Sequence, residues 1–327
     1  MPARRRPTMR DVAHEAGVAL RTVSRVVNED ATVGAPLAAR VRDAIAKLGF
    51  EPDERARQLR SGRTGTIGAA VRNISDAHPV LKAIDDTARA AGLTVVAMST
   101  EDDEQRERDA VMSMTRRRMD GIIIEPIAEN HQYLKPEIDS GLPVVAFDRP
   151  ATGVEADAVL SDNRAGIETA FRHLAGHGHR RIAYIGDDER IYTGRERATA
   201  FRECLRSSGT PYSGLVHTGP VEPDRIAAAL AATAGATALI TGNVSITVAV
   251  IRALGPDFGR RALVGFDDFP LSDLLHPPIT VIAQGVTEIG RTTVELFQAR
   301  LADPGRPVQT VIVPTTLIVR GSGEVAP

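Results

Sequence analysis

The first 50 residues carry apolar side chains at the spacing of short amphipathic helices. One such pattern follows Thr8, a good helix N-cap with Asp11 in the capping-box position, and Gly17 ends it. A second helix is expected over about residues 20–28 and a third over about residues 37–48. The pattern therefore predicts a small all-α domain at this end of the chain.

The second of these helices has two chemically different faces. Val23, Val26 and Val27 are expected to point inward. The other face is short, polar and basic, and comprises Leu20, Arg21, Ser24 and Arg25. A recognition helix needs such a face, because some of its side chains must reach base edges while others hold phosphates. Periodicity alone also permits a plain three-helix domain without a role in DNA binding.

From residue 66 onward, apolar runs alternate with longer amphipathic segments. The first runs are TIGAAV, LTVVAM, GIIIEP and PVVAF, with helices expected near residues 79–91, 104–118 and 133–140. A second set begins with AVLSDN and continues with RIAYIG, GLVHTG, ALITG and ALVGF, with helices near residues 164–175, 195–208, 223–234 and 245–254. Continuous apolar strands are typical of parallel sheets covered on both faces. We therefore predict an α/β core of two doubly wound parallel-sheet lobes, preceded by the small all-α domain.

Composition agrees with a globular protein of more than one domain. The chain has 327 residues, of which 43% are hydrophobic and 25% charged. Cys204 is the single cysteine, which excludes an intramolecular disulfide and a multi-cysteine metal site. The basic start is not followed by an apolar segment, and no apolar run of membrane-spanning length occurs. These features favour a cytoplasmic protein.

Charge is unevenly distributed along the chain. Residues 1–63 contain 13 basic and 8 acidic side chains, a net charge of +5, whereas the whole chain carries −2. The remainder is therefore acidic. A basic module on an acidic body suggests that only one end meets a polyanion such as DNA, although a solvated charged face would give the same count.

Three strings carry a resemblance to a known family. DVAHEAGV, TVSRVVN and ARQLRSGRTGTIG resemble the signature of the lac repressor (LacI/GalR) family of bacterial transcription regulators, and the resemblance continues to the end of the chain. It implies a helix-turn-helix headpiece over residues 1–52, a hinge over 53–65 and an effector-binding and dimerisation core over 66–327. The core would resemble a type I periplasmic sugar-binding protein, with lobes formed by residues 66–158 with 286–313 and 159–285 with 314–327.

The resemblance also implies which residues touch DNA. In the family the two residues after the turn read the major groove, which here are Leu20 and Arg21, and Arg25 matches an arginine that commonly contacts guanine. The other expected contacts in the headpiece are Thr8, Thr22, Ser24 and Asn28. Ala19 stands where the family usually has a serine cap, a change that predicts weaker anchoring.

In the hinge, Leu59 matches the leucine that the family wedges into the minor groove at the centre of the operator. Apolar wedges kink DNA by unstacking a base step, and Arg57 would neutralise a nearby phosphate. The alternative is an ordinary arginine-rich linker. A homodimer on a palindromic double-stranded operator is the expected assembly.

The expected effector site comprises Asp148, Arg197, Asn243, Asp267, Gln284 and Glu125. Charged and amide groups from several strand ends suit a polyhydroxyl ligand, because they offer both donors and acceptors. Each also has a structural interpretation: a turn or cap for the aspartates and Asn243, and a surface ion pair for Arg197. Glu125 and Val244 depart from the family pattern, so a sugar, a nucleoside and a cation-bearing metabolite all remain open as effectors.

Signs of catalysis or metal binding are weak. His173, His177 and His179 have a zinc-like spacing, but they match a family helix-end pattern and no carboxylate is paired with them locally. Dinucleotide, P-loop and nucleophile-elbow motifs are missing from the sequence. We therefore expect no metal, no cofactor and no enzyme activity. The family resemblance implies a regulator associated with the nucleoid. A cytoplasmic small-molecule-binding protein without a DNA role and a sugar-processing enzyme stay open as alternatives.

Overall fold

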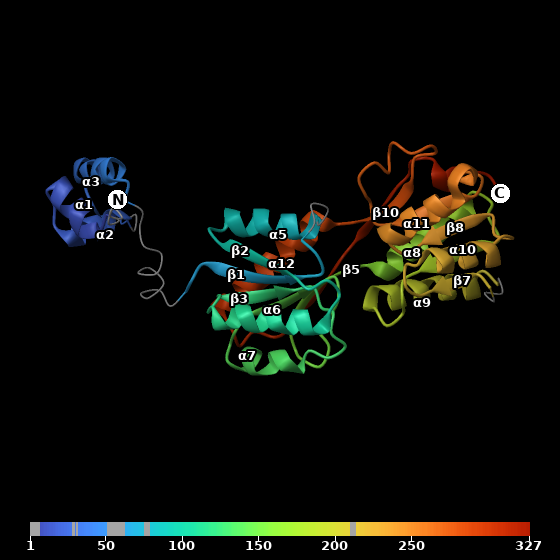
Figure 1. Ribbon diagram of the computed structural model, residues 1–327, viewed down its shortest axis with the longest axis horizontal. Coiled ribbons are helices and arrows are strands. Elements are labelled where there is room, and N and C mark those ends of the chain that lie inside the picture. Colours follow the sequence, from blue (N-terminus) through green and yellow to red (C-terminus); the bar gives the residue numbers. More distant parts are fainter. Residues whose placement is uncertain (1–6, 28–29, 31, 51–62, 75–78, 210–213) are drawn as a thin grey trace, which may run out of the picture. The chain divides into compact units, whose positions relative to one another are not determined.

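The computed structural model describes residues 7–27, 30, 32–50, 63–74, 79–209 and 214–327. The chain divides into two units, Met1–Thr64 and Gly65–Pro327 (Figure 1). None of the helices in these described ranges is both long and apolar enough to cross a membrane.

The first unit is all-α, as predicted. Its helices are α1 (Met9–Ala16), α2 (Leu20–Val27) and α3 (Ala35–Leu48). The capping box is confirmed, because the Thr8 hydroxyl accepts from the Asp11 amide and the Asp11 carboxylate accepts from the Thr8 amide at 2.7 Å. Gly17 then turns the chain in the left-handed region, at a φ of 60°. A guanidinium nitrogen of Arg40 donates to the Ala16 carbonyl at 2.6 Å and so ties α3 to the end of α1.

The first lobe of the second unit is built on a fully parallel sheet of order β11-β5-β4-β3-β1-β2. Its strands are β1 (Thr66–Val71), β2 (Thr94–Ser99), β3 (Gly121–Ile124), β4 (Val144–Phe147), β5 (Asp157–Ser161) and β11 (Thr310–Val313). Helices α5 (Pro79–Ala90) and α12 (Val286–Ala302) cover one face, and α6 (Glu104–Arg116) and α7 (Lys135–Asp139) cover the other (Figure 1).

The second lobe repeats this plan with the strand order β12-β10-β9-β8-β6-β7. Its strands are β6 (Ile182–Gly186), β7 (Val216–Thr218), β8 (Ala238–Thr241), β9 (Ala262–Phe266), β10 (Thr280–Gln284) and β12 (Thr315–Ile318), and only β12 is antiparallel to its neighbour. Its helices are α8 (Asn163–Gly176), α9 (Tyr192–Ser207), α10 (Pro223–Ala232) and α11 (Val244–Leu254). The predicted fold of two doubly wound lobes is confirmed.

One assignment of a strand to a lobe was wrong. The run AVLSDN does not begin the second lobe, because β5 pairs with β4 and β11 in the first sheet. A boundary between residues 158 and 159 would cut this strand, and the chain leaves the first sheet only after Ser161. The sheet that a short apolar run joins depends on its pairing partners, and here β11 lies about 150 residues further along the chain than β5.

The contact between α5 and α12 depends on a glycine. A Cβ added at Gly290 would lie 2.4 Å from the Ala83 Cβ and 2.7 Å from the Ala83 carbonyl carbon. Gly290→Ala is therefore expected to force the two helices apart and to lower the free energy of unfolding by about 1 to 3 kcal/mol, despite the better helix propensity of alanine. Urea denaturation measures the effect. Gly176→Ala in α8, where nothing lies within 4 Å, is the matched control and should not destabilise the protein.

Candidate functional site

The outer face of α2 presents the candidate DNA-reading side chains. Val23 and Val26 are buried in the core of the first unit, as predicted. Leu20, Arg21 and Arg25 are exposed, and Thr22 and Ser24 are half-buried. The Thr8 hydroxyl is engaged in the capping box. Asn28, Arg57 and Leu59 lie outside the described residues, so their DNA contacts stay predictions.

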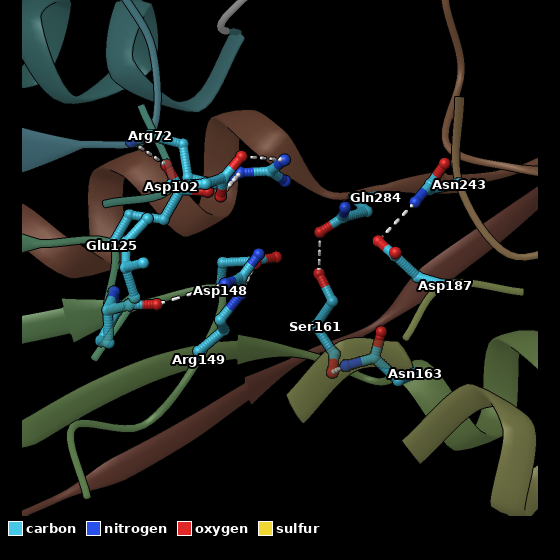
Figure 2. A network of polar contacts seen from close by, with 12 residues as sticks. Arg72, Asp102, Glu125, Asp148, Arg149, Ser161, Asn163, Asp187, Asn243 and Gln284 are labelled. Carbon is cyan, nitrogen blue, oxygen red and sulfur yellow. Dashed lines mark hydrogen bonds and ion pairs between the residues drawn. The ribbon is translucent and has the colours of Figure 1, made fainter. Parts of the chain in front are cut away.

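In the second unit, polar side chains gather at the carboxyl ends of the parallel strands. Arg72 follows β1 and Glu125 follows β3. Glu125 is only 6% exposed and accepts from the backbone N–H of Arg72 at 3.0 Å. The Arg72 guanidinium pairs with Asp102, with an Nε to Oδ1 distance of 2.7 Å (Figure 2). These contacts form one polar group on the first lobe.

Asp148 and Asp267 occupy equivalent positions in the two lobes. Asp148 follows β4 and Asp267 follows β9, the third strand from the corresponding edge of each sheet. Both adopt left-handed backbone conformations, with φ values of 63° and 71°. Such conformations are uncommon for residues other than glycine and often occur at functional sites, where surrounding contacts hold them.

Arg197 lies at the centre of the polar network in the second lobe. It is 3% exposed, and it donates from Nε to Asn163 Oδ1 at 2.7 Å and from Nη1 to the Gly242 carbonyl at 2.6 Å. Its guanidinium carbon lies 3.7 Å from the centre of the Phe266 ring. The interpretation of Arg197 as a surface ion pair was therefore wrong. Its side chain is a buried donor that also lies 3.7 Å from Asp267 Oδ2.

Asp267 joins this arginine to the segments that connect the lobes. Its Oδ1 accepts from Gln284 Nε2 at 2.6 Å, and Gln284 also accepts from the Ser161 hydroxyl, which comes from the other sheet. Burial raises the pKa of Asp267. The charge of Arg197 and the hydrogen bond from Gln284 lower this pKa only in part, and the charge of Asp148 raises it further. Asp267 therefore responds to charges from both lobes.

Asn243 serves as a helix cap, which was one of its two interpretations. Its Oδ1 accepts from the Ile246 amide at 2.9 Å at the start of α11. Its Nδ2 donates to Asp187 Oδ2 at 2.9 Å, and Figure 2 shows the two side chains pointing toward each other. A ligand contact at Asn243 would be additional to this capping role.

The loop that follows Glu125 is held by a buried carboxylate. Glu107 of α6 accepts from the Ile127 amide at 2.5 Å and from the Tyr133 hydroxyl at 2.7 Å. His131 Nε2 lies 3.4 Å from the same carboxylate. Burial alone would raise the pKa of Glu107, but these hydrogen bonds outweigh it and hold the pKa below its usual range. Glu107 is therefore ionised at neutral pH and orders this loop, and His131 Nδ1 in turn accepts at 3.1 Å from the amide of Thr152, in the loop that follows Asp148.

The structure thus connects some predicted effector residues directly and others through new partners. Arg197, Asp267 and Gln284 belong to one network, whereas Glu125 and Asn243 are bonded to Arg72 and Asp187. The residues missed from the sequence are Arg72, Asp102, Ser161, Asn163 and Asp187. Arg72 and Asp187 come directly after strands, so a search of every strand end would have found them.

Two of the three histidines with zinc-like spacing, His173 and His179, contact the C-terminal residues, whereas His177 Nδ1 contacts the His173 carbonyl at 2.9 Å. The His173 ring pairs with Glu324, a carboxylate distant in sequence. His179 contacts the Thr237 hydroxyl and the Val325 carbonyl, both at 2.8 Å. Among the described residues, no group of three or more histidine, cysteine or acidic side chains is arranged to hold a metal ion.

A cavity of about 730 Å³ in the first lobe does not belong to this site. It is lined by residues including Lys135, Asp139, Asp157 and Arg300, and by none of the expected effector residues. Two ion pairs lie within its lining, Asp157 with Arg300 at 2.9 Å and Lys135 with Asp139 at 3.0 Å, and Glu155 and Arg306 line it as well.

Comparison with known proteins identifies the class of the chain. Residues 8–53 match the family model "Bacterial regulatory proteins, lacI family", and residues 171–323 match "Periplasmic binding protein-like domain". The HTH-type transcriptional regulator PtxS of Pseudomonas aeruginosa is 31% identical, over 98% of this chain and 97% of that protein. The chain belongs to the lacI family of bacterial regulatory proteins. It is a DNA-binding transcriptional regulator with a ligand-binding core.

Another relative and two solved structures are also similar to this chain. The ribose operon repressor of Escherichia coli is 28% identical, over 96% of this chain and 99% of that protein. The lac repressor dimer bound to operator has the same fold, with a TM-score of 0.84 at 23% identity over 98% of this chain and 99% of that one. The transcriptional regulator CelR in complex with cellobiose has a TM-score of 0.69 at 27% identity, over 97% and 100% of the two chains. The curated relatives are regulators rather than enzymes.

Proposed function

We propose that this lacI-family regulator is a repressor that binds a palindromic operator as a homodimer and whose operator affinity changes when a sugar-like effector binds between its lobes. The observation that carries the proposal is the placement of strained carboxylates, Asp148 and Asp267, at equivalent strand ends of two lobes. The headpiece supplies an exposed basic face on α2. We propose no catalytic step, and a cytoplasmic location would give the regulator access to the chromosome.

The chemistry of the site favours a ligand rich in hydroxyl groups. Asp148 and Asp267 offer carboxylate acceptors. Asn243 and Gln284, which carry donors, lie in the same region as Asp148 in Figure 2, and the donor Arg197 lies 3.7 Å from Asp267. A polyol offers both donors and acceptors, so it can bond to carboxylates and amides together. CelR binds cellobiose in its solved complex, and another relative is a repressor of a ribose operon, which supports a sugar.

A ligand can change operator affinity only if it binds two arrangements of the lobes with different affinity. A ligand that bonds to Asp148 on one lobe and Asp267 on the other has this property, because its contacts depend on the separation of the two carboxylates. We expect Gln284 and Glu125 to contribute through their neighbours, since Gln284 bonds to Asp267 and Glu125 bonds to the Arg72 backbone.

Base reading by α2 provides the test of the DNA-binding part. Arg25→Ala is expected to weaken operator binding by roughly 1 to 3 kcal/mol and to relax preference at one base pair, because a bidentate arginine discriminates guanine from other bases. Binding-site selection with the full-length dimer measures both effects. Arg42→Ala, at an exposed position on α3, is the control. Unchanged affinity and base preference in Arg25→Ala would show that the reading face is assigned wrongly.

The role proposed for Leu59 concerns DNA bending. Leu59→Ala is expected to reduce operator affinity and operator bending more than binding to random DNA, because only a correctly spaced pair of headpieces brings two wedges to one deformable step. Circular-permutation gel shifts and titrations on both DNAs measure this. Equal losses on operator and random DNA would identify residues 53–65 as an ordinary linker.

Two alternatives predict different results in these assays. A small-molecule-binding protein without a DNA role would select no sequence from a random pool. A sugar-processing enzyme would convert the ligand, and mass spectrometry would then detect product after incubation.

A further inference from the structure

An acidic residue that the assignment of the headpiece leaves unexplained lies next to Arg25. Asp30 comes five residues after Arg25, and its Oδ2 lies 3.2 Å from Arg25 Nε. The Asp30 amide also donates to the Arg25 carbonyl at 2.9 Å. Two contacts, one through the backbone and one through the side chains, therefore join Asp30 to the same arginine.

The carboxylate of Asp30 is itself held in place. Its Oδ1 accepts from the Thr32 amide at 2.9 Å and from the Thr32 hydroxyl at 2.5 Å. These hydrogen bonds, the hydroxyl one above all, lower the pKa of Asp30. One carboxylate oxygen is thus engaged by Thr32, while the other faces Arg25.

The ion pair with Asp30 leaves the two terminal guanidinium nitrogens of Arg25 available for a base contact. A guanidinium carries five N–H donors, and the one nearest the aliphatic stem is on Nε. The ion pair with Asp30 uses Nε, and the Arg25 side chain remains 45% exposed. The two terminal nitrogens are the donors that an arginine uses in a bidentate contact with guanine O6 and N7.

The ion pair also restricts a flexible side chain before DNA binds. A free arginine side chain has many rotamers, and part of this conformational entropy is lost when the side chain is fixed. An arginine already oriented by a carboxylate loses less on binding and has fewer ways to reach the wrong base.

We propose that Asp30 is a specificity-determining positioning residue, which orients the Arg25 guanidinium for bidentate recognition of a guanine. The proposal rests on the proposed base-reading role of Arg25. In this proposal Asp30 strengthens the preference for the operator sequence. The same residue weakens affinity for DNA of any sequence, because a carboxylate near the DNA repels phosphates.

These opposite effects on operator preference and on random-DNA affinity distinguish a positioning role from a structural one. Asp30→Asn keeps the shape of the side chain and removes its charge. We expect the ratio of operator affinity to random-DNA affinity to fall about 3- to 10-fold, with the loss of preference at the same base pair that Arg25→Ala affects. Affinity for random DNA should stay equal or rise. A structural role would instead weaken binding to both DNAs and lower the melting temperature.

Three further variants complete the experiment, which uses the full-length dimer in binding-site selection and fluorescence titration. Thr32→Val removes the hydroxyl that holds Asp30 and should relax the same base pair to a smaller extent, even if Asp30→Asn folds poorly. Asp43→Asn removes the same charge from an exposed position on α3 and should leave base preference unchanged. Adding Asp30→Asn to Arg25→Ala should relax preference no further, because the residue that Asp30 positions is then missing.

The outcomes distinguish the two proposals. If Arg25→Ala relaxes one base pair and Asp30→Asn retains full preference there, the positioning role of Asp30 is wrong while the reading role of Arg25 stands. If Asp30→Asn weakens all sequences alike, Asp30 is structural and the proposal fails. If Arg25→Ala changes no base preference, the reading role itself fails, and the positioning role fails with it.

Discussion

Replacing Arg197 with alanine is expected to lower the free energy of unfolding of the two-lobed core by about 3 kcal/mol or more. The guanidinium is 3% exposed, so its removal leaves Asn163 Oδ1 and the Gly242 carbonyl without their donor, and leaves Asp267 without its nearest cation. Urea denaturation followed by circular dichroism measures the loss. The Arg197 charge lowers the pKa of Asp267, so its removal raises that pKa in the folded protein. Because the ionised carboxylate is then disfavoured by folding, the destabilisation should be larger at pH 8 than at pH 5.

Arg195→Ala is the matched control for this prediction. Arg195 lies on the same helix, two positions earlier, but its side chain is exposed. Its removal should change the free energy of unfolding by less than about 1 kcal/mol. Equal stability of the two variants would contradict the central structural role of Arg197. A large effect at Arg197 also means that loss of effector response in this variant cannot by itself identify a ligand contact.

The fold could be predicted largely because strands buried on both faces tolerate few polar residues. Runs such as GIIIEP and ALITG therefore stand out between amphipathic helices, and both lobes follow from their alternation. The pairing of strands distant in sequence could not be predicted in the same way. β5 lies between β4 and β11, and no local feature of AVLSDN indicates β11 as a neighbour.

The candidate site could be predicted in its residues but not in its bonds. Asp148 and Asp267 directly follow strands, and the carboxyl ends of parallel strands meet at one edge of a sheet. The partners of Arg197 come from the start of α8 and the end of β8, and the spacing of these segments along the chain gives no sign of their contact. Asp30 shows the same limit, because a charged residue after a helix is usually no more than solvated surface.

The strongest test of the effector site uses two isosteric substitutions. Asp148→Asn and Asp267→Asn are each expected to weaken effector binding roughly 10- to 150-fold, because a hydrogen bond to a charged group contributes about 1.5 to 3 kcal/mol. In the Asp267→Asn variant the new amide oxygen can still accept from Gln284, so the fold should be kept. Isothermal titration with the sugar that changes operator affinity of the wild type measures the loss. Asp86→Asn, on the surface of α5, is the control.

The pH dependence of effector binding then distinguishes the two aspartates. In the wild type, affinity should fall as pH decreases through the raised pKa of Asp267, because a ligand hydroxyl donates to the ionised carboxylate and protonation removes that acceptor. The decline should begin at a higher pH than for an ordinary aspartate. Asp148→Asn removes a like charge that helps to raise the pKa of Asp267, so the decline should move to lower pH. Asp267→Asn should abolish that part of the decline. If effector affinity fell in the same way with decreasing pH in all three proteins, the effector would not bond to Asp267. The effector site would then have to lie elsewhere.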